Sequence, residues 1–169
     1  MINRATAAMK GLWTLLEAAR SLPGVSFVVV GREGSDDTLA RLQARAPDNV
    51  SFTARFVSDD ALIELYRRAR VYAQISAHEG FGVAMAESMA CGCVPVIADG
   101  HALAEIAGPV ALHVPYSSVA ATAVAIQEAL RADDVTRDAA RERVVSRYPI
   151  ARRTERLTAL LEPLISRSR

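Results

Sequence analysis

The chain has 169 residues, of which 51% are apolar and 23% charged, with a formal net charge of +1. These values are typical of one soluble globular domain with a full-sized core, and they give no general attraction to nucleic acid. No apolar run approaches the roughly 20 residues of a membrane-spanning helix, and the N-terminus lacks the pattern of a signal peptide, so we expect a cytoplasmic protein.

The first half of the chain alternates helices with strands. Leucines at helical spacing predict a helix over 11–22, and Pro23-Gly24 ends it. The β-branched run 25–31 is too apolar to face water on either side, which predicts a central strand of a parallel sheet. Ser58 is a suitable N-cap for another helix. The remaining elements expected here are helices over 36–46 and 58–69 and strands over 50–52 and 71–75.

The second half continues the alternation and then becomes helical. A helix is expected over 83–91, and Gly92 follows it where a left-handed C-cap belongs. The other expected elements are strands over 94–98 and 110–114 and helices over 102–106, 118–131, 134–147 and 151–166. This order predicts a Rossmann-like, doubly wound parallel sheet with helices on both faces.

Ligands of such sheets bind beyond the carboxyl ends of the strands. This rule brings together the loops over 31–35, 76–82 and 99–101. Residues 4–11 join them if a strand precedes them, and the chain begins so near Arg4 that most of such a strand would be missing. The loop after Gly31 lacks the glycine spacing of a dinucleotide site, but its place at the rim permits contact with a base or a phosphate.

Residues 78–98 are the most informative stretch. Glu79 and Glu87 are separated by seven residues, and the flexible backbone of residues 80–82 lies between them. A helix is expected to begin after Gly82, and a helix N-terminus is a ready anion site. Carboxylates that hold hydroxyls beside N–H groups that hold phosphate suit a nucleotide sugar. The alternative is solvated surface glutamates, which fits Glu87 less well because its helix has little polar face.

No metal or cofactor is expected from the cysteines and histidines. Cysteines as close in the sequence as Cys91 and Cys93 rarely form a disulfide, and their spacing is not that of a redox or metal motif. We expect two small buried thiols in a reducing compartment. His78, His101 and His113 share no metal-ligand spacing.

Residues 78–98 resemble the C-terminal, donor-binding domain of the large retaining glycosyltransferase family of GT-B fold, glycosyl transferases group 1. The family pattern is Glu-Gly-Phe-Gly, a second Glu after seven residues, and then Ala-x-Gly-x-Pro-Val. Further matches are Lys10-Gly11, the strand at 27–31 and the helix at 58–69. The resemblance covers nearly the whole chain and implies the C-terminal half of a GT-B fold.

The resemblance also implies roles for individual residues. Glu79 would hold hydroxyls of the donor sugar, and Glu87 would hold the ribose hydroxyls. Lys10 and Arg4 would neutralise the leaving diphosphate, although Arg4 lies one position farther from Lys10 than the family places its arginine. A solvated cation after a helix over 5–9 is the alternative for Lys10. The backbone expected against sugar and phosphate oxygens is that of Gly80, Phe81, Gly82 and Val83.

Two further regions bear on the nucleotide. In the family the neighbourhood of Phe56 receives the base, and Gly31 lies on the same rim. The family's Gly-Gly-x-x-Glu loop departs here, because His101 replaces the second Gly and Ala104 replaces a common Pro, so contacts from that loop are left open; Glu105 remains available to support the site.

The resemblance implies a single nucleotide-sugar-binding domain over residues 1–169, a fragment without the N-terminal acceptor-binding half. The full enzyme would move a hexose from a nucleotide diphosphate sugar to an acceptor hydroxyl with retention and without a bound metal. The isolated domain would bind donor and transfer it poorly or not at all. The alternatives are a non-catalytic nucleotide-sugar-binding module and a GT-B-like epimerase or phosphorylase. Lys10 is the only lysine, which argues against a phosphorylase that uses pyridoxal phosphate.

The C-terminal third is basic, but glutamates interleave with its arginines. Mixed helix faces in solvent are the simpler interpretation. The alternative is attraction to the inner face of an anionic membrane that carries a lipid-linked acceptor.

Overall fold

The computed structural model describes residue 2 and residues 4–166, with backbone only for Arg4, His101 and 164–166. The strands are β1 Phe27–Val30, β2 Val50–Thr53, β3 Val71–Gln74, β4 Val94–Ala98 and β5 Leu112–Val114. The helices are α1 Arg4–Met9, α2 Leu12–Arg20, α3 Thr38–Arg45, α4 Asp59–Arg68, α5 Val83–Ala90, α6 His101–Ala107, α7 Val119–Leu130, α8 Asp134–Arg147 and α9 Ile150–Ser166, with a 3-10 turn η1 at Gly108–Val110.

The strands form parallel pairs, as the alternation predicts. β1 pairs with β2, with Phe27 beside Val50, and β3, β4 and β5 form a three-stranded sheet in that order. An isolated parallel bridge joins Ile2 to Glu33. The expected strand over 110–114 is shorter than predicted, because Gly108 has a φ of 62° and Pro109 follows it in the 3-10 turn.

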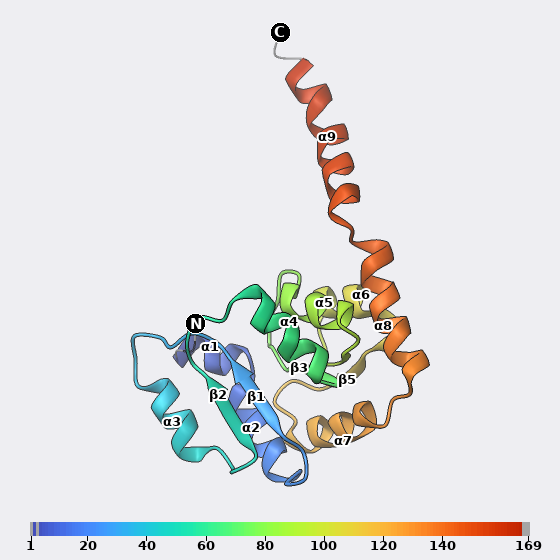
Figure 1. Ribbon diagram of the computed structural model, residues 1–169. Coiled ribbons are helices and arrows are strands. Elements are labelled where there is room, and N and C mark those ends of the chain that lie inside the picture. The colour runs from blue at the N-terminus through green and yellow to red at the C-terminus, as the bar shows by residue number, and fades with distance from the viewer. Residues whose placement is uncertain (1, 3, 167–169) are drawn as a thin grey trace.

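Helices cover both faces of the three-stranded sheet, which confirms the doubly wound α/β architecture (Figure 1). One core layer joins α2 and α7 to the strands through residues such as Ala18, Ile126 and Val96. A second layer on the other face joins α5, α6 and α8, with Met85 and Met89 at its centre. A third cluster packs α2 and α3 against β1 and β2.

The expectation that the apolar run around β1 is buried on both sides is wrong. Val29 is buried against α2 and α3, but Val28 and Val30 are 51% and 39% exposed. β1 pairs only with β2 among the named strands, and the face that carries Val28 and Val30 lies open.

Local signals place α5, which follows the glutamate motif. Gly92 has a φ of 85°, the left-handed conformation expected just past the end of this helix. Two guanidinium groups from α8 then bind the carbonyls there: Arg141 donates to Ala90, and Arg137 donates to Gly92 at 3.0 Å. Cations at this end also complement the helix dipole, so α8 fixes the direction of α5.

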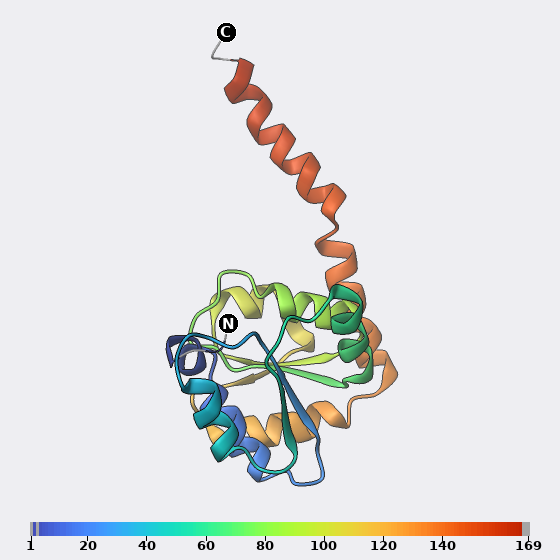
Figure 2. The same ribbon diagram turned by 60° about the vertical axis from the view of Figure 1, so that its left-hand side comes forward.

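The last helix, α9, leaves the body of the domain. Both views show it extending beyond α8 and away from the sheet (Figures 1 and 2). Large apolar side chains of its described part, among them Ile150 and Leu160, are exposed. Within residues 2 and 4–166, no helix combines the length and the apolarity that crossing a membrane requires.

Candidate functional site

The loops that follow β1, β2 and β3 lie with α1 along one edge of the domain, the upper side of the domain body below α9 in Figure 1. This is the carboxyl edge of the strands, where ligands of open α/β sheets bind. The turn between α1 and α2 belongs to the same edge, because the backbone N–H of Ala77, in the loop after β3, donates to the carbonyl of Met9 at 2.7 Å.

Lys10 and Glu79 meet at this edge as an ion pair, in which the Lys10 ammonium donates to Oε1 of Glu79. Gly11 explains the close approach of their two segments. It has a φ of 65°, and a Cβ at this position would lie 2.1 Å from the carbonyl oxygen of Ile75. Only glycine fits both the conformation and the contact, so Gly11 brings Lys10 to the loop.

The Glu79 carboxylate lies among polar side chains from the segment that ends β3 and from Lys10. Partial burial would raise its pKa, but the hydrogen bond from Lys10 and the side chains of Ser76 and Gln74 outweigh burial, so the pKa lies below its usual value. The contact with Ser76 is not a complete hydrogen bond, because Oγ of Ser76 has no hydrogen-bond partner among the residues described. Glu79 is therefore ionised at neutral pH and held from several sides.

The glycine-rich loop after Glu79 ends at the N-terminus of α5. Gly82 is the residue before the helix, has a φ of 83° and packs so closely on α6 that a Cβ would lie 2.5 Å from Leu103. The first N–H groups of an α-helix have no partner within the helix, so those of α5 are directed to this edge. Phe81 is anchored by an edge-on contact with Tyr148, with ring centroids 5.5 Å apart.

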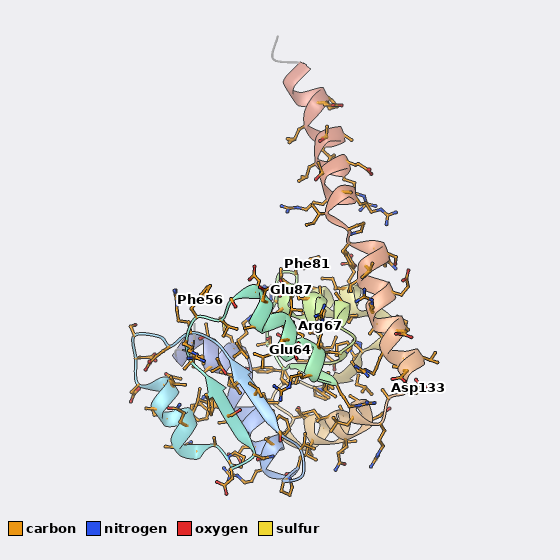
Figure 3. The ribbon with its side chains drawn as sticks, viewed as in Figure 1. Phe56, Glu64, Arg67, Phe81, Glu87 and Asp133 are labelled. Carbon is orange, nitrogen blue, oxygen red and sulfur yellow. The ribbon has the colours of Figure 1, made fainter. Side chains whose placement is uncertain are left out.

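Glu87 lies one turn into α5, and its side chain is exposed. Figure 3 shows it near the upper end of α4, on the same side of the domain as Phe81. Burial and then the charge of Glu87 raise the pKa of Tyr66, whose hydroxyl interacts with this carboxylate. Tyr72 contacts Tyr66 edge-on, with ring centroids 5.9 Å apart. Burial contributes most to raising the pKa of Tyr72, followed by the interaction with Tyr66 and then by the charges of Glu79 and Glu87. The tyrosine pair is therefore close enough to both carboxylates to be affected by their charges.

Gly31 and Phe56 line a separate cavity of about 220 Å³ beyond the ends of β1 and β2. Phe56 is 79% exposed and stands clear of the motif loop in Figure 3. The remaining lining residues are Val30, Arg32, Arg55, Val57 and Leu62. An aromatic ring, an apolar wall and two guanidinium groups could receive a flat, polar ring that carries an anion.

Another cavity, of about 310 Å³, lies among α1, α2 and α3. Its walls include Trp13 and Arg45, whose guanidinium carbon lies 5.6 Å from the Trp13 ring centre. None of the residues predicted to bind a donor lines this cavity. Although it is larger than the cavity beside Phe56, we do not assign the donor site to it.

The structure brings some of the predicted residues together and leaves others apart. Lys10 and Glu79 are in direct contact, and Glu87 lies on the adjoining helix. Gly80 and Val83 are exposed in the loop and at the helix start. The predicted role of Arg4 falls on a side chain outside the described residues, although its backbone begins α1.

Sequence reasoning missed Gln74, Ser76 and the tyrosine pair. Tyr72 and Gln74 occupy alternate positions of β3, and alternate residues of a strand point to one face, while Ser76 continues this spacing just after the strand. Polar residues at this spacing in the strand expected over 71–75 were the available signal, and they lead directly to Glu79.

Two sequence comparisons relate this chain to known proteins. The profile of the family described as glycosyl transferases group 1 matches residues 1–145. The D-inositol 3-phosphate glycosyltransferase of Mycolicibacterium smegmatis is 37% identical over 91 residues, which cover 50% of this chain and 20% of that protein.

Solved structures resemble the chain over most of its length. Sucrose-phosphate synthase from Thermosynechococcus elongatus superposes with a TM-score of 0.82 at 25% identity, over 94% of this chain and 43% of that one. HepE from Anabaena, solved in complex with UDP-glucose, also gives 0.82, at 20% identity, over 92% of this chain and 46% of that one, a likeness that shows the fold. The chain thus spans less than half the length of these structures, and its fold is the C-terminal half of a GT-B fold. The chain belongs to the glycosyl transferases group 1 family.

Proposed function

We propose that this chain is the donor-binding domain of a retaining glycosyltransferase that moves a hexose from a nucleoside diphosphate sugar to an acceptor hydroxyl. The observation that carries the proposal is the meeting, at one edge of the sheet, of the Lys10–Glu79 ion pair with the N-terminus of α5 and Glu87. A cation, free N–H groups and two carboxylates match the phosphates and hydroxyls of such a donor.

The diphosphate would lie between Lys10 and the start of α5. As the bond from the anomeric carbon to the phosphate oxygen breaks, the leaving diphosphate keeps the electron pair and gains negative charge. An ammonium group and the N–H groups that begin at Val83 would stabilise that charge, since they are already placed before the reaction. Arg4 is the second proposed cation, and no metal ion is required in this scheme.

The two carboxylates would bind different hydroxyls. Glu79 would accept hydrogen bonds from the donor sugar, close to the diphosphate, because it starts next to Lys10. Glu87 would accept from the ribose, one helical turn away. A carboxylate that accepts two neighbouring hydroxyls makes charge-assisted bonds, which are stronger than neutral ones. The backbone from Gly80 to Gly82 would lie against the ligand between them.

The base would enter the cavity beside Phe56 and Gly31. A base that stacks on an aromatic ring loses exposed apolar area on both partners, and stacking is worth about 1–3 kcal/mol per base in nucleic-acid complexes. The high exposure of Phe56 supports this role, because a ring that already packs in the core could not stack on a ligand.

The remaining parts of the proposal concern the whole enzyme. The acceptor oxygen would bond to the anomeric carbon and pass its proton to the departing diphosphate, and a second, N-terminal GT-B domain would position that acceptor. We propose that residues 1–169 alone bind donor without transferring it, in the cytoplasm. We also propose that the acceptor is lipid-linked and that the basic C-terminal third contacts the inner face of the membrane.

Calorimetric titration of residues 1–169 with UDP, GDP, ADP and the corresponding glucose and mannose nucleotides tests the proposal. One nucleotide should bind, and its sugar derivative should bind at least as tightly. A chain that binds none of these ligands would contradict the proposal. Product analysis with the full-length protein then separates a transferase from a non-catalytic sugar-nucleotide module and from an epimerase, because only a transferase forms a new glycosidic bond.

A further inference from the structure

Two buried polar atoms at the end of β3 lack hydrogen bonds. Oε1 of Gln74 and Oγ of Ser76 have no partner in the described part of the chain, and the two residues are only 8% and 4% exposed. Buried polar groups are paired in the great majority of cases, and an unpaired one costs free energy. An apolar residue of similar size would fill the position of Gln74 without that cost, so its polarity calls for another explanation.

Both side chains belong to the face of β3 that leads to Glu79. Ile75, on the opposite face, packs in the core layer under α2 and α7, whereas Tyr72 packs in the layer of α5. Gln74 and Ser76 continue the line of Tyr72 toward the carboxyl edge, since side chains alternate along a strand. They end beside the Glu79 carboxylate, with which both interact.

Lys10 is the strongest partner of Glu79, and the proposed donor would compete with Glu79 for Lys10. Lys10 is bound to Glu79 here, but a diphosphate carries more negative charge than one carboxylate and would draw the ammonium toward itself. Glu79 would then lose the cation that favours its ionised form, while it remains partly buried. The amide of Gln74 and the hydroxyl of Ser76 are the groups that would still face it.

We propose that Gln74, assisted by Ser76, is a positioning residue that keeps Glu79 ionised and directed at the donor sugar after Lys10 has moved to the diphosphate. This inference rests on the proposed function, because it assigns the sugar to Glu79. It explains why two polar side chains are kept in a buried place: the amide N–H groups of Gln74 and the hydroxyl of Ser76 are donors near a carboxylate whose principal partner changes when ligand binds.

The test compares Gln74→Met with Gln127→Met, the same substitution at an exposed position of α7. Methionine keeps the size of glutamine and removes its polar atoms. For each chain, calorimetry measures the affinity for the nucleoside diphosphate that the unmodified chain binds best and for its sugar derivative. Urea unfolding measures stability, and carbon NMR of the side-chain carboxyl follows the titration of Glu79 in the ligand-free chain. Lys10 and Tyr72 are the other titratable groups facing it.

For Gln74→Met we expect about a tenfold loss of affinity for the sugar nucleotide, the effect of roughly one hydrogen bond, and less than a twofold change for the nucleoside diphosphate. Glu79 should titrate at higher pH, and the urea midpoint should be unchanged or higher. Gln74→Asn, which keeps the amide, should recover part of the lost affinity. The Gln127→Met chain should behave like the unmodified one.

Three outcomes would overturn the inference. Unchanged affinity of Gln74→Met for the sugar nucleotide would remove the positioning role and leave the proposed function standing. A lower urea midpoint with equal losses for both ligands would show a purely structural role. An unmodified chain that binds no nucleotide of the panel would remove the proposed function and this inference with it.

Discussion

Lys10 and Glu79, 69 residues apart in the sequence, form an ion pair across the carboxyl edge of the sheet. The two groups were expected to bind different parts of one ligand, and in the ligand-free chain they bind each other. Gly11 and the Ala77–Met9 hydrogen bond hold their segments together. A donor must therefore exchange this pair for contacts with its own phosphate and hydroxyls.

Replacing Lys10 by Met tests both sides of this exchange. The pKa of Glu79 is lowered in the folded chain, so the pair contributes stability above the unfolded pKa of about 4.3, and this contribution disappears as the pH falls through the folded pKa. Because Lys10 is 42% exposed, we expect a loss below about 1 kcal/mol at pH 7, which shrinks as the pH falls through the folded pKa of Glu79, by urea unfolding. Affinity for the nucleoside diphosphate should fall about tenfold or more. A stability loss as large at pH 2 as at pH 7 would contradict the assignment, and Arg20→Met is the matched surface control.

Phe56→Ala should separate binding from folding. The ring is 79% exposed, so its removal should change the free energy of unfolding by no more than about 0.5 kcal/mol. If the base stacks on it, affinity for the free nucleoside should fall by about 1–3 kcal/mol, or roughly 5- to 150-fold. Equal affinities for the variant and the unmodified chain, measured by calorimetry, would move the base elsewhere.

Asn49→Ala should destabilise the fold without touching the site. The side-chain amide of Asn49 donates to the carbonyls of Ala19, Leu22 and Val25 at 2.8–3.0 Å, which ties the end of α2 to the start of β1. Ala19 and Leu22 keep backbone donors for their carbonyls, so the substitution removes three side-chain contacts and leaves the Val25 carbonyl without its donor, and we expect a cost of about 1–3 kcal/mol in urea unfolding. Asp48→Ala, at an exposed neighbouring position, is the control, and an equal effect of both substitutions would rule out this explanation.

Most of the fold could be predicted from the sequence because local signals agree. Ser58 caps α4 by accepting from the backbone N–H of Ala61, as its position predicts, and Gly92 adopts the expected left-handed conformation. The strand at Val94–Ala98 is fully buried and has the expected bounds. The burial of β1 was predicted wrongly. An apolar sequence shows that a strand can be buried on both faces, but the neighbouring strands and helices determine which faces are buried.

The site was predictable in its motif and not in its surroundings. The glutamates and glycines of residues 79–87 are adjacent in sequence and form one loop and one helix. Lys10, Gln74 and Tyr66 reach them from three other segments, and only the packing of those segments shows which side chains meet. Polar residues on alternate strand positions were visible beforehand, but their partner was not.

The two cysteines should differ in reactivity. Burial raises the pKa of the Cys93 thiol to about 12, and its sulfur lies 3.2 Å from the carbonyl oxygen of Tyr66. At pH 8 the Cys93 thiolate, which is the reactive form, is therefore scarce. A polar disulfide reagent should therefore label one thiol, that of the half-buried Cys91, in the folded chain and two after unfolding. Rapid labelling of two thiols in the folded chain would contradict the burial of Cys93, and Cys91→Ala should abolish the fast phase.

The most direct test of the account is the affinity of Glu87→Gln for the nucleoside diphosphate that the unmodified chain binds best. The substitution keeps the shape of the side chain and removes the charge that should accept the ribose hydroxyls, while Glu128→Gln makes the same change at an exposed position of α7. A charge-assisted hydrogen bond is worth about 1.5–3 kcal/mol, so calorimetry should show a loss of roughly 10- to 150-fold for Glu87→Gln and none for Glu128→Gln. Equal affinities of Glu87→Gln and the unmodified chain would contradict the proposed donor site.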